Sequence, residues 1–299
     1  MKVVTSGSAY LDIDAYAGCI GYAELLNIEG EETVAASSAP LNESITARLR
    51  GLGSIATNAQ SNEFVVIDVS EPNFLDPITQ SGQVVEVIDH HPGFEQFWQD
   101  KLGDRAQIEE VGAACTQVVE RWQTAGKLEL MTPQTAELLA AGILDNTLNF
   151  TAQITNERDH AAYKLLQQIG GLPEDFAARY FSDVQSAMEA DLKTAIINDA
   201  KQLKDIPKLP EYMGQLVVWD ANTIISQRLD DVRAAMDSLA TDWGINLVSI
   251  AEANSYFLGS TKEAEAKLAS LLGVEFKDGI SNPHPIMLRK EILKAAISG

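Results

Sequence analysis

An apolar stretch at residues 84–93 ends abruptly in an acid and two imidazoles. Val84, Val85, Val87 and Ile88 surround a single Glu, and Asp89, His90, His91, Pro92 and Gly93 follow directly. A β-branched run of this length predicts a buried strand of a parallel sheet. Loops at the carboxyl ends of such strands are where open α/β sheets place their chemistry. We therefore expect this strand to deliver Asp89, His90 and His91 to the edge of a sheet.

Four further acids lie beside the ends of apolar segments. Asp12 and Asp14 precede a small-residue helix, Asp68 closes the apolar strand 64–70, and Asp145 follows the apolar helix 135–144. An Asp at a helix start can simply cap backbone donors, whereas an Asp on a buried strand needs a partner or a cation. Together with His90, these carboxylates form a ligand set that suits Mn²⁺ or Mg²⁺. The set is large enough for two cations with one Asp between them.

Strands and helices alternate through the first half of the chain. A first strand and the loop after it are predicted within 3–10, further strands at 64–70, 84–89 and 106–111, and helices at 41–52, 117–124, 135–144 and 155–169. This alternation predicts an α/β fold with a mostly parallel sheet flanked by helices. The small residues at 112–116 open a helix; they either let backbone amides approach an anion or allow tight helix packing.

A second, smaller α/β domain is predicted for the rest of the chain. It would contain one long helix at 184–203, strands at 216–219, 246–250 and 256–259, and helices at 228–240 and 262–272. The predicted domains are 1–185 and 190–299, with the active site in the cleft between them.

Charge and cysteine usage limit the partners and the compartment. A formal net charge of −21 argues against nucleic-acid duplexes and anionic membranes as partners, and is explained by solubility, by bound cations, or by both. No apolar run is long enough to span a bilayer, and the first residues lack the pattern of a signal peptide. Cys19 and Cys115 lie among small apolar residues. We expect two buried thiols in a reducing cytoplasm.

The order of these motifs resembles that of the DHH (Asp-His-His) phosphoesterase superfamily. The matching motifs are Gly7 with Asp12, Asp14 and Ala15; Asp68; Asp89-His90-His91; and Asp145-Asn146-Thr147. The second half is similar to the associated C-terminal domain of family II inorganic pyrophosphatases and exopolyphosphatases, through Asp199-Ala200-Lys201 and Leu288-Arg289-Lys290. A Gly-Gly-Gly-His motif, typical of the oligonucleotide-cleaving branch, is absent from the sequence.

The resemblance implies a role for each motif residue. Asp12, Asp14, Asp68, His90 and Asp145 would be metal ligands, with Asp68 between two ions. His91 would contact a phosphate oxygen and assist the leaving group, and Asp89 would orient an imidazole. Lys201, Arg289 and Lys290 would bind phosphate across the interdomain cleft. A lone Lys201 would otherwise be read as part of a solvated helix face.

Two positions depart from the family pattern. Ser8 stands where the pyrophosphatases have a His ligand, and Leu11 stands where they have Pro. A hydroxyl is a poorer ligand than an imidazole, so one of the two metal sites should be weaker. Glu291 and Ile292 stand where Lys and Gln would extend the basic run, which removes a positive charge from the phosphate clamp.

The resemblance implies a cytoplasmic hydrolase that cleaves P–O–P anhydrides by two-metal activation of water, with Mn²⁺ or Mg²⁺ as cofactor. The expected substrate is a small phosphate compound, inorganic pyrophosphate or short polyphosphate. Two alternatives stay open: a phosphodiesterase or phosphatase acting on a small nucleotide, and a catalytically weak relative that binds phosphate ligands. The interpretation allows a homodimer and excludes a nucleic-acid duplex or a membrane as partner.

Overall fold

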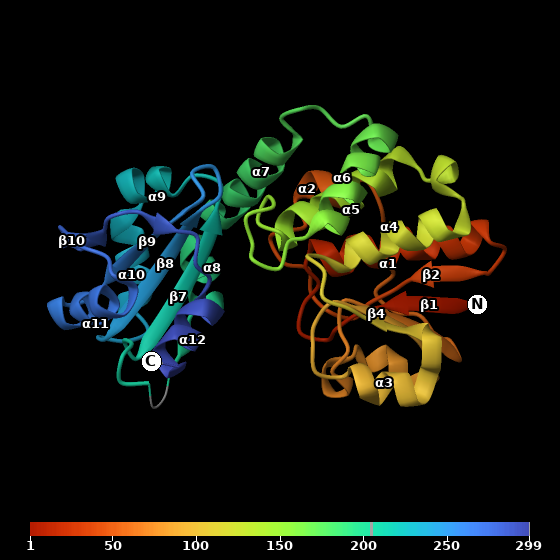
Figure 1. The fold of residues 1–299 in the computed structure, drawn as a ribbon, viewed down its shortest axis with the longest axis horizontal. Helices are drawn as coiled ribbons and strands as arrows, with labels where there is room; N and C mark the ends of the chain where they lie inside the picture. Colours follow the sequence, from red (N-terminus) through yellow and green to blue (C-terminus); the bar gives the residue numbers. More distant parts are fainter. Residues whose placement is uncertain (204–205, 299) are drawn as a thin grey trace. The chain divides into compact units, whose positions relative to one another are not determined.

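The structure is a computed structural model that describes residues 1–203 and 206–298. The chain divides into two compact units, Met1–Tyr180 and Phe181–Gly299 (Figure 1). The division falls inside helix α7, Phe176–Ala190. The limits of the two functional domains therefore stay a prediction. Within the described residues, no helix is both long and apolar enough to cross a bilayer.

The first unit is built on a five-stranded sheet in the order β2-β1-β3-β4-β5, and every pairing in it is parallel. Its strands are β1 Lys2–Thr5, β2 Thr33–Ala35, β3 Glu63–Ile67, β4 Gln83–Asp89 and β5 Ala106–Ile108. Its helices are α1 Ile13–Ile28, α2 Ala47–Arg50, α3 Glu95–Leu102, α4 Ala114–Ala125, α5 Pro133–Asn146 and α6 Glu157–Gly170. Short 3-10 helices lie at Pro72–Phe74, Pro77–Ser81, Gly103–Arg105 and Leu128–Leu130. The predicted parallel sheet flanked by helices is confirmed.

Helices cover both faces of this sheet, with α3 on the opposite side from α1 and α5 (Figure 1). On one face, Trp98 of α3 packs with Val66 and Val87. On the other, α1 approaches β3 so closely that a Cβ added at Gly18 would lie 2.7 Å from Cγ2 of Ile67. The alternating side chains of β3 are thus buried on both sides, as its unbroken apolar sequence predicts.

The second unit contains a mixed sheet in the order β10-β11-β9-β8-β7-β6, and β12 also pairs with β9. Only the β7–β8 pairing of its described strands is parallel. The strands are β6 Lys201–Gln202, β7 Tyr212–Val218, β8 Trp243–Ser249, β9 Asn254–Gly259, β10 Phe276–Lys277, β11 Ile280–Ser281 and β12 His284–Pro285. The helices are α8 Leu192–Asp199, α9 Ala221–Gln227, α10 Leu229–Asp237, α11 Lys262–Leu272 and α12 Arg289–Ser298.

Two apolar clusters, one on each face, hold this second sheet between helices. One cluster joins α8, α9 and α10 to the sheet, and the other joins α11 and α12 to it. Every residue of β8 is buried, as expected for a strand in the middle of a covered sheet. The prediction of a second α/β unit is confirmed.

Several predicted helices are wrong in extent. Of the helix expected at 41–52, only Ala47–Arg50 forms, because Asn42 bonds the backbone of Ser44 and Thr46 caps α2. The helix expected at 184–203 is divided at Asp191, whose side chain caps α8 by accepting from the Thr194 amide. Lys201 therefore lies on strand β6 and not on a helix.

Two further boundaries differ from the prediction. The helix expected at 228–240 forms as α10, Leu229–Asp237, and a helix that was not predicted, α9, comes directly before it and is separated from it by Arg228. Helix α5 continues through Asn146, so Asp145 lies inside its last turn and not after it. Cys19 and Cys115 are both buried and free, as predicted.

Candidate metal centre

Asp68 leaves the sheet at the carboxyl end of β3 in a left-handed conformation. Its φ is +64°, a region that Asp tolerates better than most non-glycine residues. The backbone amide of Asp68 still donates to the carbonyl of Ile88 on β4, at 2.8 Å. The conformation costs about 1 kcal/mol and is held by this contact with the neighbouring strand. The side chain of Asp68 is 6% exposed.

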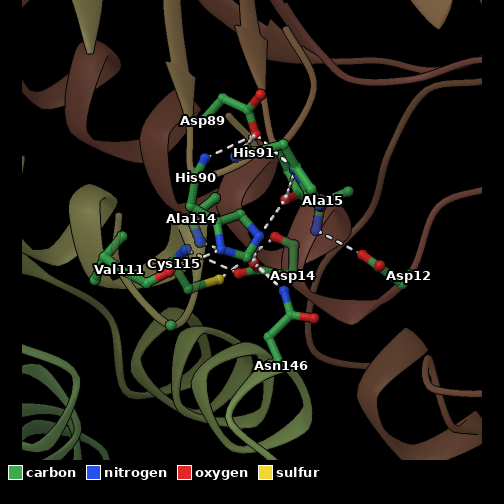
Figure 2. Close-up of polar contacts among 12 residues, drawn as sticks. Asp12, Asp14, Ala15, Asp89, His90, His91, Val111, Ala114, Cys115 and Asn146 are labelled. Atoms are coloured by element: carbon green, nitrogen blue, oxygen red, sulfur yellow. Dashed lines mark hydrogen bonds and ion pairs between the residues drawn. The ribbon is translucent and has the colours of Figure 1, made fainter. Parts of the chain in front are cut away.

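Asp89, the last residue of β4, fixes the residues that follow it. Its Oδ1 accepts from the His90 amide at 2.8 Å, from the His91 amide at 3.2 Å and from Nδ1 of His91 at 2.8 Å (Figure 2). Burial acts to raise the pKa of Asp89, but the His91 hydrogen bond and the nearby imidazoles outweigh it, so this pKa lies below its ordinary value. The lowered pKa favours the ionised carboxylate, which accepts a hydrogen bond from the His91 ring; the role of Asp89 in catalysis stays a prediction.

His90 points a free nitrogen at Asp68. Its Nδ1 lies 2.9 Å from the carbonyl oxygen of Val111, which can only accept, so Nδ1 carries the proton. In the neutral ring Nε2 then offers a lone pair, 3.2 Å from Oδ1 of Asp68. Both of these buried atoms lack a hydrogen-bond partner among the described residues. An imidazole nitrogen and a carboxylate oxygen left open side by side fit a divalent cation.

Asp14 lies beside this pair and is held by the start of α4. Its carboxylate accepts from the amides of Ala114 and Cys115, each at 2.8 Å, and from the side-chain amide of Asn146 (Figure 2). Asp14 Oδ2 is 3.8 Å from Nε2 of His90. The small residues at the start of α4 therefore bring backbone amides to an anion, and that anion is a carboxylate of the protein itself.

Asp12 and Asp145 complete the group of acids. Asp12 is the N-cap of α1 and accepts from the Ala15 amide at 3.0 Å. Asp145 accepts from the hydroxyl of Tyr180 at 2.7 Å. Asp12 and Asp145 each accept a hydrogen bond from the protein itself, so neither residue needs a metal in order to have a hydrogen-bond partner.

The electrostatics show a group of acids with too little positive charge around them. Burial, followed by the charges of Asp14 and Asp12, raises the pKa of Asp68 well above its ordinary value. Burial and the charge of Asp14 also raise the pKa of Asp12. Burial raises the pKa of Asp145 to about 7. Carboxylates forced together in this way are typical of sites where a cation supplies the missing charge.

The structure brings some of the predicted residues together and leaves others apart. One ligand atom each from Asp68, His90 and His91 lie within 4.8 Å of one another. Asp14 Oδ2 lies 3.8 Å from His90 Nε2, the charges of Asp14 and Asp12 act on Asp68, and the same two charges act on Asp145. The backbone amide of Ser8 donates to the carbonyl of Phe74 at 2.8 Å, and the residue is half-buried. The metal-binding roles of these residues stay predictions.

The predicted phosphate-binding residues lie in the second unit. Lys201 is exposed on β6, and Lys290 is exposed in the first turn of α12. Arg289 donates from Nη1 to the Asp199 carbonyl at 2.7 Å, and both its terminal nitrogens contact the Asp199 carboxylate. The two sequence signatures of this half are therefore joined by an ion pair.

Three groups that hydrogen-bond to the predicted ligands were not predicted from the sequence: the Val111 carbonyl, the Asn146 side-chain amide and the Tyr180 hydroxyl. Asn146 stands next to a predicted ligand, which is a usable signal. No sequence signal indicates Val111 or Tyr180, because every residue has a carbonyl and Tyr180 is distant in sequence from Asp145.

Comparison with known proteins finds similarities over the first unit and over most of the chain. Residues 2–143 match the model of the DHH family, N-terminal domain. A candidate manganese-dependent inorganic pyrophosphatase from Deinococcus radiodurans is 26% identical over 247 residues, covering 77% of this chain and 75% of that protein. The manganese-dependent inorganic pyrophosphatase of Methanothrix thermoacetophila is 23% identical over 301 residues, covering 94% and 92%.

A solved structure shares the fold of the chain. The crystal structure of a candidate family II inorganic pyrophosphatase from Methanococcus jannaschii matches with a TM-score of 0.65 and 20% identity, over 100% of both chains. Residues 2–143 are therefore similar to the DHH family N-terminal domain, and the chain shares its fold with this candidate family II inorganic pyrophosphatase.

Proposed function

We propose that this protein is a manganese-dependent hydrolase of P–O–P anhydrides, acting on inorganic pyrophosphate or short polyphosphate. The observation that carries the proposal is the pair of buried, unpartnered atoms, Asp68 Oδ1 and His90 Nε2, at 3.2 Å. The names of the two sequence relatives, both manganese-dependent pyrophosphatases, support the choice of metal and substrate. Small phosphate compounds, and no duplex or membrane, are the proposed partners in a cytoplasmic setting.

Asp68 and His90 would hold the cofactor together with Asp12, Asp14 and Asp145. The oxygen-rich donor set with one imidazole fits Mn²⁺ or Mg²⁺, and the number of carboxylates fits two ions. Divalent cations bound there would make water a stronger nucleophile and neutralise charge on the phosphoryl oxygens. The three raised carboxyl pKa values describe the site without a cation, and bound cations would favour the ionised carboxylates.

His91 would contact a phosphate oxygen of the substrate and assist the leaving group. Its Nδ1 hydrogen bond to Asp89 raises the pKa of His91, which favours the doubly protonated ring. The side chain is 61% exposed, so Nε2–H is available to a phosphate oxygen of the substrate. Donation from Nε2 would offset the charge that builds on the departing phosphate.

The second unit would supply the positive charges that hold the substrate. Arg289 has five N–H donors, and its hydrogen bonds to the Asp199 carboxylate fix the orientation of its guanidinium group. Lys201 and Lys290 are exposed and would add point charges for the phosphate. That Arg289, Lys201 and Lys290 bind the substrate is part of the proposal.

A phosphate-release screen tests the function. The full chain, stripped of metal and then given Mn²⁺ or Mg²⁺, is offered pyrophosphate, tripolyphosphate, long polyphosphate and a cyclic dinucleotide. We expect metal-dependent phosphate release from pyrophosphate or tripolyphosphate. Cleavage of the dinucleotide alone would contradict the anhydride assignment and favour a nucleotide phosphodiesterase. Tight binding of these phosphates without turnover would identify a phosphate-binding relative.

A further inference from the structure

One short segment, residues 111–115, contacts two of the proposed ligands at once. The Val111 carbonyl accepts from Nδ1 of His90 at 2.9 Å, while the amides of Ala114 and Cys115 donate to Asp14 at 2.8 Å (Figure 2). Figure 2 shows Val111 and Cys115 beside the imidazole of His90, with dashed lines from Asp14 to the amides of Ala114 and Cys115. The position of this segment therefore sets the direction of both the imidazole and the carboxylate.

The segment is itself held by a carboxylate that touches none of the ligands. Asp159, on α6, is fully buried. Its two oxygens accept from the Gly112 amide at 3.1 and 3.0 Å, and Oδ1 also accepts from the Thr116 hydroxyl at 2.7 Å. Its Oδ2 further accepts from the Asn156 amide at 2.9 Å. Asp159 thus holds the segment near its beginning through Gly112 and just beyond its end through Thr116.

The packing leaves the segment no room to move toward this carboxylate. A Cβ added at Gly112 would lie 2.6 Å from both Asp159 Oδ2 and Cγ2 of Thr147. On the other side, a Cβ added at Gly142 of α5 would lie 2.6 Å from Sγ of Cys115. Backbone hydrogen bonds and glycine contacts therefore fix the segment at both its beginning and its end.

We propose that Asp159 is a positioning residue for the metal centre, acting through residues 111–115 on His90 and Asp14. The inference rests on the proposed function in one respect, that a divalent cation binds there. Replacing Asp159 by Asn would turn an amide N–H₂ toward the N–H of Gly112 or of Asn156, two donors facing each other. The segment would have to shift, and His90 and Asp14 would lose their alignment.

If Asp159 had only a structural role, replacing it would lower the stability of the fold without a specific loss of metal affinity. Asp159 also takes part in the capping box of α6, so its loss destabilises the fold in either case. Glu24 provides a matched control, because its carboxylate caps the start of α5 by accepting from the Thr132 amide at 2.8 Å and from two threonine hydroxyls. None of these contacts of Glu24 involves a proposed ligand.

The test is calorimetric titration of the metal-stripped full chain with Mn²⁺, alongside urea unfolding without metal. We expect Asp159→Asn to weaken Mn²⁺ binding by about 10–100-fold, the range seen when a partner of a metal ligand is lost. Thr116→Val, which removes one hydrogen bond to Asp159, should weaken it less. Glu24→Gln should lose stability and keep the wild-type affinity.

Four outcomes would overturn this inference or its basis. Wild-type Mn²⁺ affinity in Asp159→Asn would show a structural role only. Equal losses of affinity in Asp159→Asn and Glu24→Gln would show a general effect of instability. If Asp159→Asn does not fold, unchanged affinity in Thr116→Val overturns the inference, and reduced affinity supports it. Wild-type protein that binds no Mn²⁺ would contradict the proposed function itself.

Discussion

Replacing Asp145 by Asn should make the metal-free protein more stable at neutral and alkaline pH. Burial, opposed by the Tyr180 hydrogen bond and aided by Asp12 and Asp14, raises the pKa of Asp145 from 3.8 to about 7. The folded protein therefore keeps a proton that the unfolded chain releases. An acid with a raised pKa lowers the free energy of unfolding as pH rises between these two values.

The size of the effect follows from the two pKa values. Each pKa unit corresponds to about 1.4 kcal/mol. The amount by which Asp145 lowers the free energy of unfolding should therefore grow by about 3 kcal/mol between about pH 4.5 and about pH 8. Asn cannot ionise, and its carbonyl oxygen can still accept from the Tyr180 hydroxyl. The free energy of unfolding of Asp145→Asn, relative to wild type, should therefore increase by about 3 kcal/mol over this pH range.

Urea unfolding followed by circular dichroism, in the presence of a chelator, measures this difference. Asp104→Asn, which changes an exposed carboxylate, is the matched control and should show no such pH-dependent increase. Added Mn²⁺ should make wild type more stable than Asp145→Asn, because wild type would bind the ion more tightly. A ligand at about 100 times its Kd stabilises the folded state by about 2.7 kcal/mol. If the difference in free energy of unfolding between wild type and Asp145→Asn stays constant with pH, the assignment of Asp145 as a buried acid with a raised pKa is refuted.

Four further changes test the other parts of the site. Asp68→Asn should abolish measurable Mn²⁺ binding by calorimetry and lower turnover by orders of magnitude while circular dichroism stays that of wild type; normal turnover would exclude the bridging role. Ser8→His should tighten the weaker of two metal sites and favour Mn²⁺ over Mg²⁺ in a metal titration; two equally tight sites in the wild type would show that Ser8 does not occupy a ligand position. Lys201→Ala or Lys290→Ala should raise KM for pyrophosphate and lower kcat without changing Mn²⁺ affinity; loss of metal with normal substrate kinetics would contradict the proposed division of labour. His91→Gln should lower kcat far more than Mn²⁺ affinity, and unchanged kcat would rule out proton donation from this ring.

The sheet of the first unit was predictable because its strands are continuous apolar runs. The β-branched run from Val84 to Ile88 is typical of a strand covered on both faces, and the structure places it next to β3 in the sheet. Helix limits were harder to predict because they depend on side-chain caps. The contact of Asp191 with the Thr194 amide divides one apolar pattern into two helices, and the bond from the Ser44 amide to Asn42 replaces the start of another.

The acids and imidazoles of the site were predictable from their positions at element ends, but their geometry was not. The sequence indicates Asp68 and His90 as ligands without indicating that Oδ1 and Nε2 lie 3.2 Å apart. It also leaves the role of 112–116 open. Only the fold shows that these small residues bring amides to Asp14, because α1 and α4 are distant in sequence. The buried Asp159 carries no motif and is found only through its contacts.

The pairing of Asp68 with His90 is the central claim, and anomalous diffraction from crystals grown with Mn²⁺ tests it most directly. Data collected near the manganese absorption edge locate the ion without assumptions about the ligands. The account predicts an anomalous peak in direct contact with Asp68 Oδ1 and His90 Nε2, with Asp14 beside it. A fully occupied peak elsewhere in the molecule, with these two atoms uncoordinated, would contradict it.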